Sequence, residues 1–245
     1  MSTPGYYKVD HGALSVSGST QTGGPLTAPP EYSVTRVMQQ TPVGWMPMFW
    51  GDLESTERGL SARFWEATAR HRKDFQSLGF IAVGFKKLTR ILNPLHRDNG
   101  GVNYLDTTRS HFGQLIYNRT CVALPLDADK EQVTIVFTAV FERGNVSYTN
   151  NNSPFGSLPH HDVFRLSSDD VGLMYRKFAE HLKSRTEPPR RFPDDDSLRR
   201  WFDANQMEIF EDRVQRGIFI RMSDGEVETV RKKLPPPLPE GPDAA

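Results

Sequence analysis

The chain has 245 residues, and its 30 lysines and arginines balance its 30 aspartates and glutamates, so the formal net charge is zero. A balanced charge creates no overall field that would attract nucleic acid, and we expect no nucleic-acid partner. The sequence has no run of about eighteen apolar residues and no secretion signal, which predicts no membrane span and a cytoplasmic location. Its single cysteine, Cys121, cannot form an internal disulfide.

Composition divides the chain into three parts. Residues 1 to 40 are rich in Gly, Ser, Thr, Pro and Gln without periodicity, which predicts a flexible N-terminal segment. Residues 41 to 233, about 190 in all, have the length of a single domain that needs no disulfide or metal for its stability. Residues 234 to 245 form a proline-rich tail that we expect to be disordered.

An aromatic segment begins this domain. Two tryptophans, two methionines and a phenylalanine lie between Pro42 and Trp50. These side chains either pack over the edge of a sheet, or Trp45, Phe49 and Trp50 form an exposed patch that contacts a protein partner or a membrane interface. Pro47 within the segment argues against an amphipathic membrane helix.

A helix is predicted from Asp52 to Leu78, because apolar residues recur three or four positions apart on one face. Gly79 ends it, as a left-handed glycine commonly does at a helix C-terminus. His71 lies on the apolar face, where a lone histidine is usually a core residue with one ring nitrogen hydrogen-bonded.

Strands follow this helix. Residues 80 to 92 read as a strand with a bulge at Gly84, and residues 96 to 101, which contain two adjacent glycines, read as a turn. Residues 102 to 106 and 112 to 124 are predicted to be further strands.

Residues 132 to 150 give the strongest pattern in the chain. β-branched and aromatic residues fill both faces of a predicted strand up to Phe141, and Gly144 and Asn145 supply a tight reversal before Val146 resumes the alternation. A β-hairpin is therefore predicted in the middle of the sheet.

The C-terminal third reads as a short strand at 163 to 166, a helix from about 169 to 184, a second helix from 194 to 217, a strand at 218 to 222 and a last helix up to 234. Strands joined by short turns make an antiparallel sheet. The fold class predicted is α+β, with an antiparallel sheet of about five strands and helices packed mainly on one face.

The sequence His160-His161-Asp162 is the strongest candidate for catalysis or metal binding, because imidazoles and a carboxylate occur together after a loop. Neighbouring residues of an extended chain point in opposite directions, so His160 and Asp162 are the predicted metal ligands. A closed site then requires further ligands, for which His96 and His111 are candidates. The alternative is that these three are simply polar residues at the point where a loop leads into a strand.

The tail contains a PxxP pattern after Lys233. Pro235, Pro236 and Pro239 can form a polyproline II helix of the kind that groove-bearing modules bind, or a stiff solvated tail.

These observations lead to a non-enzymatic α+β module that binds a protein through the aromatic segment or the tail, with no cofactor. The alternative function is a metal-dependent or acid/base hydrolase centred on His160, His161 and Asp162. A third possibility is a small-ligand pocket near Tyr117 and Tyr148.

Overall fold

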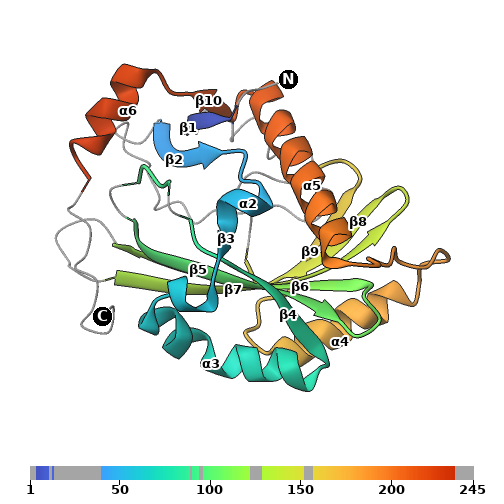
Figure 1. The fold of residues 1–245 in the computed structure, drawn as a ribbon. Helices are drawn as coiled ribbons and strands as arrows, with labels where there is room; N and C mark the ends of the chain where they lie inside the picture. The colour runs from blue at the N-terminus through green and yellow to red at the C-terminus, as the bar shows by residue number, and fades with distance from the viewer. Residues whose placement is uncertain are drawn as a thin grey trace, which may run out of the picture.

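The computed structural model describes residues 4–10, 13, 40–88, 90–93, 96–121, 129–151 and 157–234. They form a large seven-stranded sheet and a small three-stranded sheet (Figure 1). The large sheet contains, in spatial order, β3 (Glu54–Ser55), β4 (Phe80–Lys86), β5 (His96–Asp106), β6 (His111–Cys121), β7 (Asp129–Phe141), β8 (Gly144–Thr149) and β9 (His161–Arg165). The small sheet contains, in spatial order, β10 (Phe219–Arg221), β1 (Gly5–Asp10) and β2 (Gln40–Met46). The helices are α2 (Trp50–Leu53), the 3-10 helix η3 (Glu57–Gly59), α3 (Ala62–Ser77), α4 (Val171–Leu182), α5 (Asp195–Gln215) and α6 (Asp224–Arg231).

The predicted α+β class is confirmed. Neighbouring strands of the large sheet are antiparallel except at one edge, where β9 pairs with β8 in parallel. The predicted hairpin is β7 with β8, joined through the pair Phe141↔Gly144. Gly144 has φ +149°, a conformation that favours glycine. Ile135, Phe137 and Ala139 of β7 have no exposed surface, so this strand lies in the middle of the core.

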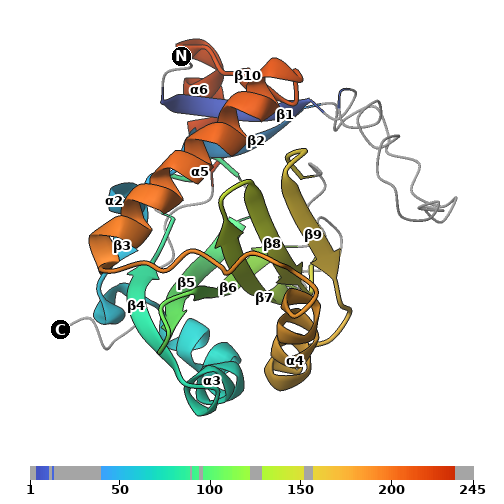
Figure 2. The same ribbon diagram turned by 90° about the vertical axis from the view of Figure 1, so that its right-hand side faces the viewer.

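Helices cover both faces of the large sheet (Figure 2). On one face α3 and α4 bury a cluster that includes Phe64, Phe137 and Phe178. On the other face Trp50 of α2 and Phe202 of α5 pack with residues such as Leu105 and Phe112 of the sheet. Helices α3 and α4 therefore lie on one face, as expected, whereas α5 packs on the opposite face of the large sheet.

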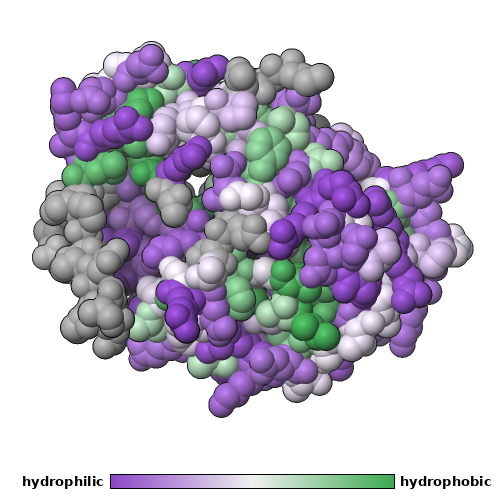
Figure 3. All heavy atoms as spheres, viewed as in Figure 1, coloured by the Kyte–Doolittle hydropathy of each residue, from purple (hydrophilic) through white to green (hydrophobic). Residues whose placement is uncertain are grey.

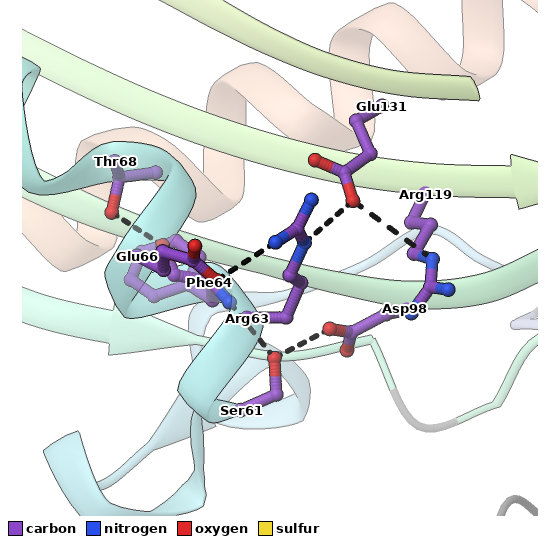
Figure 4. Close-up of polar contacts among 8 residues, drawn as sticks. All are labelled: Ser61, Arg63, Phe64, Glu66, Thr68, Asp98, Arg119 and Glu131. Atoms are coloured by element: carbon purple, nitrogen blue, oxygen red, sulfur yellow. Dashed lines mark hydrogen bonds and ion pairs between the residues drawn. The ribbon is translucent and has the colours of Figure 1, made fainter. Parts of the chain in front are cut away.

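The first long helix begins later than predicted. The stretch that follows Asp52 is divided into the end of α2, the two residues of β3 and η3, and α3 starts only after Ser61. The Ser61 hydroxyl accepts a hydrogen bond of 3.0 Å from the amide of Phe64 and donates one to the carboxylate of Asp98 in β5 (Figure 4). This serine cap defines the helix start more strongly than the acidic residue at 52.

An ion-pair network attaches the same helix to the middle of the sheet. Arg63 Nε lies 2.7 Å from Glu131 Oε1 of β7, and Arg63 Nη1 lies 2.8 Å from Glu66 Oε2 (Figure 4). The Arg63 guanidinium lowers the pKa of the Glu131 carboxyl. These groups lie at the surface, so each pair adds little stability and acts mainly in positioning α3.

The turn predicted for residues 96 to 101 is wrong, because these residues belong to β5. A Cβ on Gly100 would lie 2.7 Å from Phe64 Cδ2, and one on Gly101 would lie 2.7 Å from Lys86 Cε. The two glycines therefore serve close packing on both faces of a strand rather than a reversal of the chain.

The small sheet is assembled from distant parts of the sequence. Strand β1 pairs with β2 on one side and with β10 on the other. Its Tyr7 and Val9 are buried against Phe210 and Phe219. Residues 5 to 10 are therefore folded, in contrast to the flexible segment expected for residues 1 to 40; residues 14 to 39 lie outside the described residues.

Candidate functional site

Three potential metal ligands meet where the turn before β9 passes α5. One ligand atom from each of His160, His161 and Glu208 lies within 4.8 Å of the other two. His160 Nε2 is 3.0 Å from Glu208 Oε1, and the two imidazole centroids are 4.6 Å apart. The expectation that the two histidines point in opposite directions is wrong, because His160 lies in a turn and β9 begins only at His161.

The backbone of the central hairpin holds this turn in place. The amide of Asn145 donates a 3.1 Å hydrogen bond to the carbonyl oxygen of His160. A Cβ on Gly144 would lie only 1.9 Å from that oxygen, so a residue without a side chain is required for the approach. The hairpin glycine thus has two roles, in the β7–β8 reversal and in seating His160.

Two asparagines fix the ring of His161. Asn145 Nδ2 lies 2.9 Å from His161 Nε2 and donates to Asn205 Oδ1 of α5 at 3.2 Å. Burial, followed by the charge of His160, lowers the pKa of His161. The neutral imidazole that results at neutral pH is the form that coordinates metals.

Asp162, one of the two predicted ligands, lies apart from this group. Its carboxylate forms an ion pair with Arg185, whose guanidinium lies 5.6 Å from the ring centroid of Phe141. Because Asp162 follows His161 in an extended strand, the two side chains leave β9 on opposite faces. The structure therefore brings Glu208, rather than Asp162, next to His160.

The other two candidate ligands have local partners. His96 Nε2 lies 3.0 Å from Asn99 Nδ2 within β5. His111 Nδ1 lies 3.3 Å from Asp106 Oδ2 and 3.2 Å from the Tyr175 hydroxyl. Among the described side chains, neither histidine belongs to the group formed by His160, His161 and Glu208.

The three aromatic residues chosen as partner contacts differ in burial. Trp50 is only 4% exposed and packs edge-on against Phe202, with ring centroids 5.3 Å apart. Trp45 is half-buried between Tyr6, at 5.3 Å, and the guanidinium of Arg90, at 4.9 Å. Phe49 is also half-buried. Trp50 thus has almost no surface for a partner, whereas the other two rings retain some.

The remaining candidates lie elsewhere. Pro235, Pro236 and Pro239 are outside the described residues. Tyr117 is fully buried against Phe64, and the Tyr148 hydroxyl lies 3.2 Å from a ring nitrogen of His181. None of the helices in the described ranges is long and apolar enough to cross a membrane.

Comparison with protein-family models, curated proteins and solved structures finds no match for this chain. The side chains themselves must therefore support any functional assignment. Glu208 was missed by sequence reasoning because it occurs on a helix of mixed polarity, where an acidic residue is typical of the solvent-exposed face.

Proposed function

We propose that the chain binds a divalent transition-metal ion through His160, His161 and Glu208, and that it is a metal-dependent hydrolase. The observation that carries the proposal is the convergence of three ligand atoms within 4.8 Å from two separate elements. Two imidazoles and a carboxylate are the donor set of many catalytic zinc sites. The hydrolase alternative predicted from sequence therefore gains support, with Glu208 in the place of Asp162.

The spacing of the donors suits a small ion after a modest adjustment. Ligands at about 2.1 Å from a tetrahedral zinc ion lie about 3.4 Å from one another. The 3.0 Å between His160 and Glu208 is already close to that value, and the widest separation in the group must shorten by about 1.4 Å. His160 and Glu208 are both exposed, so their side chains are free to make this movement.

The asparagines provide the outer support that metal-binding histidines usually have. Rotation of the Asn145 and Asn205 amides by about 180° lets Asn145 Oδ1 accept a hydrogen bond from the N–H of His161 Nε2, which leaves Nδ1 of that ring for the metal. A zinc ion held by His160, His161 and Glu208 would activate a water molecule for hydrolysis near neutral pH. Glu208 is exposed, so a substrate can reach this site from solvent.

The test is metal titration of the full chain. Zinc affinity is measured by isothermal titration calorimetry, and Co²⁺ absorbance reports tetrahedral coordination. Glu208→Gln and His161→Gln are expected to weaken binding of either ion at least about tenfold, a loss of about 1.4 kcal/mol. Asp162→Asn is the matched control, because it removes the neighbouring carboxylate that pairs with Arg185.

If Glu208→Gln keeps the zinc affinity of wild type and Asp162→Asn loses it, the ligands are His160 and Asp162, as predicted from sequence. Absence of zinc and cobalt binding by the wild-type chain would refute the metal site altogether. Hydrolysis is tested separately, with the zinc-loaded chain and chromogenic phosphate, carboxylate and glycoside esters.

A second proposal retains the protein-binding function, limited to Trp45 and Phe49. Its support is that both rings keep exposed surface on one segment, whereas Trp50 does not. Replacing both by alanine should abolish the capture of a specific partner while the melting temperature falls only slightly. If every captured protein is retained by the double variant, this surface does not bind a partner. The proline-rich tail remains a prediction, tested by truncation after residue 234.

A further inference from the structure

A lysine lies on the face of the large sheet that carries α2 and α5. Lys86, the last residue of β4, places its ammonium 5.8 Å from the ring centroid of Phe202. Among the described side chains, which do not include those of residues 53 to 55, no carboxylate forms an ion pair with it and no acceptor forms a hydrogen bond with it. Burial lowers the pKa of Lys86 to about 8. A half-buried ammonium without a partner destabilises the ligand-free fold.

The residue opposite Lys86 is a glycine, and the lysine stem occupies the space that a side chain would fill. Gly101 pairs with Lys86 across β4 and β5. A Cβ there would meet Lys86 Cε at 2.7 Å and Lys86 Cγ at 3.0 Å, so the lysine stem lies flat against the backbone of β5. The stem is thereby directed along the sheet surface.

Polar side chains continue from Lys86 on the same face. Asn103, two residues beyond Gly101, is only 2% exposed, and its Oδ1 accepts a 3.0 Å hydrogen bond from Gln114 Nε2 of β6. The Asn103 Nδ2 donor has no partner within the described part of the chain. Two residues apart on one strand share a face, so this donor and the ammonium beside Gly101 are directed to the same side.

The space-filling view shows hydrophilic residues around a hollow between the layer of the small sheet and the large sheet (Figure 3). A pocket with a few oriented polar groups over an otherwise packed sheet is typical of sites for small ligands. We propose that Lys86 and Asn103 bind a small oxyanion, a carboxylate or phosphate group, on this face of the sheet.

Both donors fit that ligand class. An ammonium and an amide donate to anionic oxygens through charge-assisted hydrogen bonds, which are stronger than those between neutral groups. The anion also neutralises the half-buried ammonium, so binding removes an unfavourable feature of the ligand-free chain. Gln114 orients Asn103 by occupying its carbonyl oxygen, which turns the amide nitrogen toward the ligand. This site is separate from the metal group and does not depend on the proposed hydrolase activity.

The test uses inorganic phosphate and succinate as probes, in a buffer of low ionic strength that contains neither. Thermal unfolding and calorimetry are measured on the full chain for wild type, Lys86→Met, Asn103→Leu and Lys73→Met. Lys73→Met is the matched control, because it removes the same charge from an exposed position of α3. At least one probe should raise the melting temperature of wild type and of Lys73→Met, and the stronger probe identifies the oxyanion.

Lys86→Met should weaken probe binding by more than about tenfold, and the ligand-free variant should melt at a higher temperature than wild type because the unpaired charge is gone. Glu54 opposes Lys86 across β3 and β4, so Glu54→Gln is included and should retain or tighten binding. Equal probe affinity in wild type and Lys86→Met, or no response of wild type to either probe, overturns the proposal.

A measurement on the unmodified chain covers the case in which Lys86→Met does not fold. Limited acetylation followed by peptide mapping compares Lys86 with Lys73. Saturating probe should slow acetylation of Lys86 several-fold and leave Lys73 unchanged. Equal rates at Lys86 with and without the probe contradict the site.

Discussion

Replacement of Gly144 by alanine tests the link between the central hairpin and the candidate metal site. The new Cβ would lie 1.9 Å from the carbonyl oxygen of His160, and φ is +149° at this position. Forcing a non-glycine residue into such a conformation costs about 1–3 kcal/mol. Displacement of His160 also breaks the 3.1 Å hydrogen bond from the amide of Asn145, a loss of about 1 kcal/mol. The expected decrease in the free energy of unfolding is therefore about 2–4 kcal/mol.

The assay is equilibrium unfolding in urea, followed by circular dichroism and by the fluorescence of the four tryptophans. Gly225→Ala is the control, since a Cβ at Gly225 in the first turn of α6 meets nothing within 4 Å. Alanine in a helix is favoured over glycine, so this control should gain about 0.5–1 kcal/mol.

The zinc affinity of the same variants is a second measurement. Gly144→Ala moves the carbonyl of His160, so its zinc affinity should fall while that of Gly225→Ala stays at the wild-type value. A Gly144→Ala chain as stable as wild type would refute the close approach of the hairpin to His160. If Gly144→Ala is destabilised but binds zinc normally, the close packing of Gly144 against His160 is supported. The role of Gly144 in positioning His160 as a metal ligand is then contradicted.

Three further predictions concern the core, acid stability and a helix cap. Trp50→Ala should cost about 3–5 kcal/mol in urea unfolding, because it empties a buried site beside Gly84; a loss below about 1 kcal/mol would contradict its place in the core. Burial lowers the pKa of His71, so the unfolded chain binds its proton more readily and stability falls as pH drops below about 6.5. His71→Leu should reduce the difference between unfolding free energies at pH 7.5 and pH 5.5, and an unchanged difference would contradict a neutral buried ring. Ser61→Ala should cost about 1 kcal/mol by removing the cap of α3 and its bond to Asp98, which thermal unfolding can detect; an unchanged melting temperature would show that the cap does not stabilise the helix.

Local signals predicted the elements whose determinants lie close together in sequence. The β7–β8 hairpin follows from alternation and from one glycine, and these act within twenty residues. The cap at Ser223, with Glu226 three residues later, forms the capping box that its spacing indicates. Asp194 at the start of α5 also caps its helix, although the side chain that completes the box is that of Ser197.

The failures share a long-range cause. Gly100 and Gly101 resemble a turn until Phe64 and Lys86 are known to pack against them. Strand β1 has only six residues within a segment rich in Gly, Ser and Pro, and its pairing with β2 and β10 is not visible in the local sequence. Glu208 joins the two histidines only after α5 has crossed the sheet, so no spacing in the sequence identifies it as a ligand.

The arrangement of the small sheet has a consequence for folding during synthesis. Strands β4 to β8 pair with sequence neighbours, so most of the large sheet can form hairpin by hairpin as the chain leaves the ribosome. Strand β1 emerges first, but its partner β10 is nearly a whole chain length away and becomes available last. Closing so long a loop is entropically costly and slow. Until then Tyr7 and Val9 lack Phe219, so a nascent chain exposes the apolar face of β1, to which chaperones can bind.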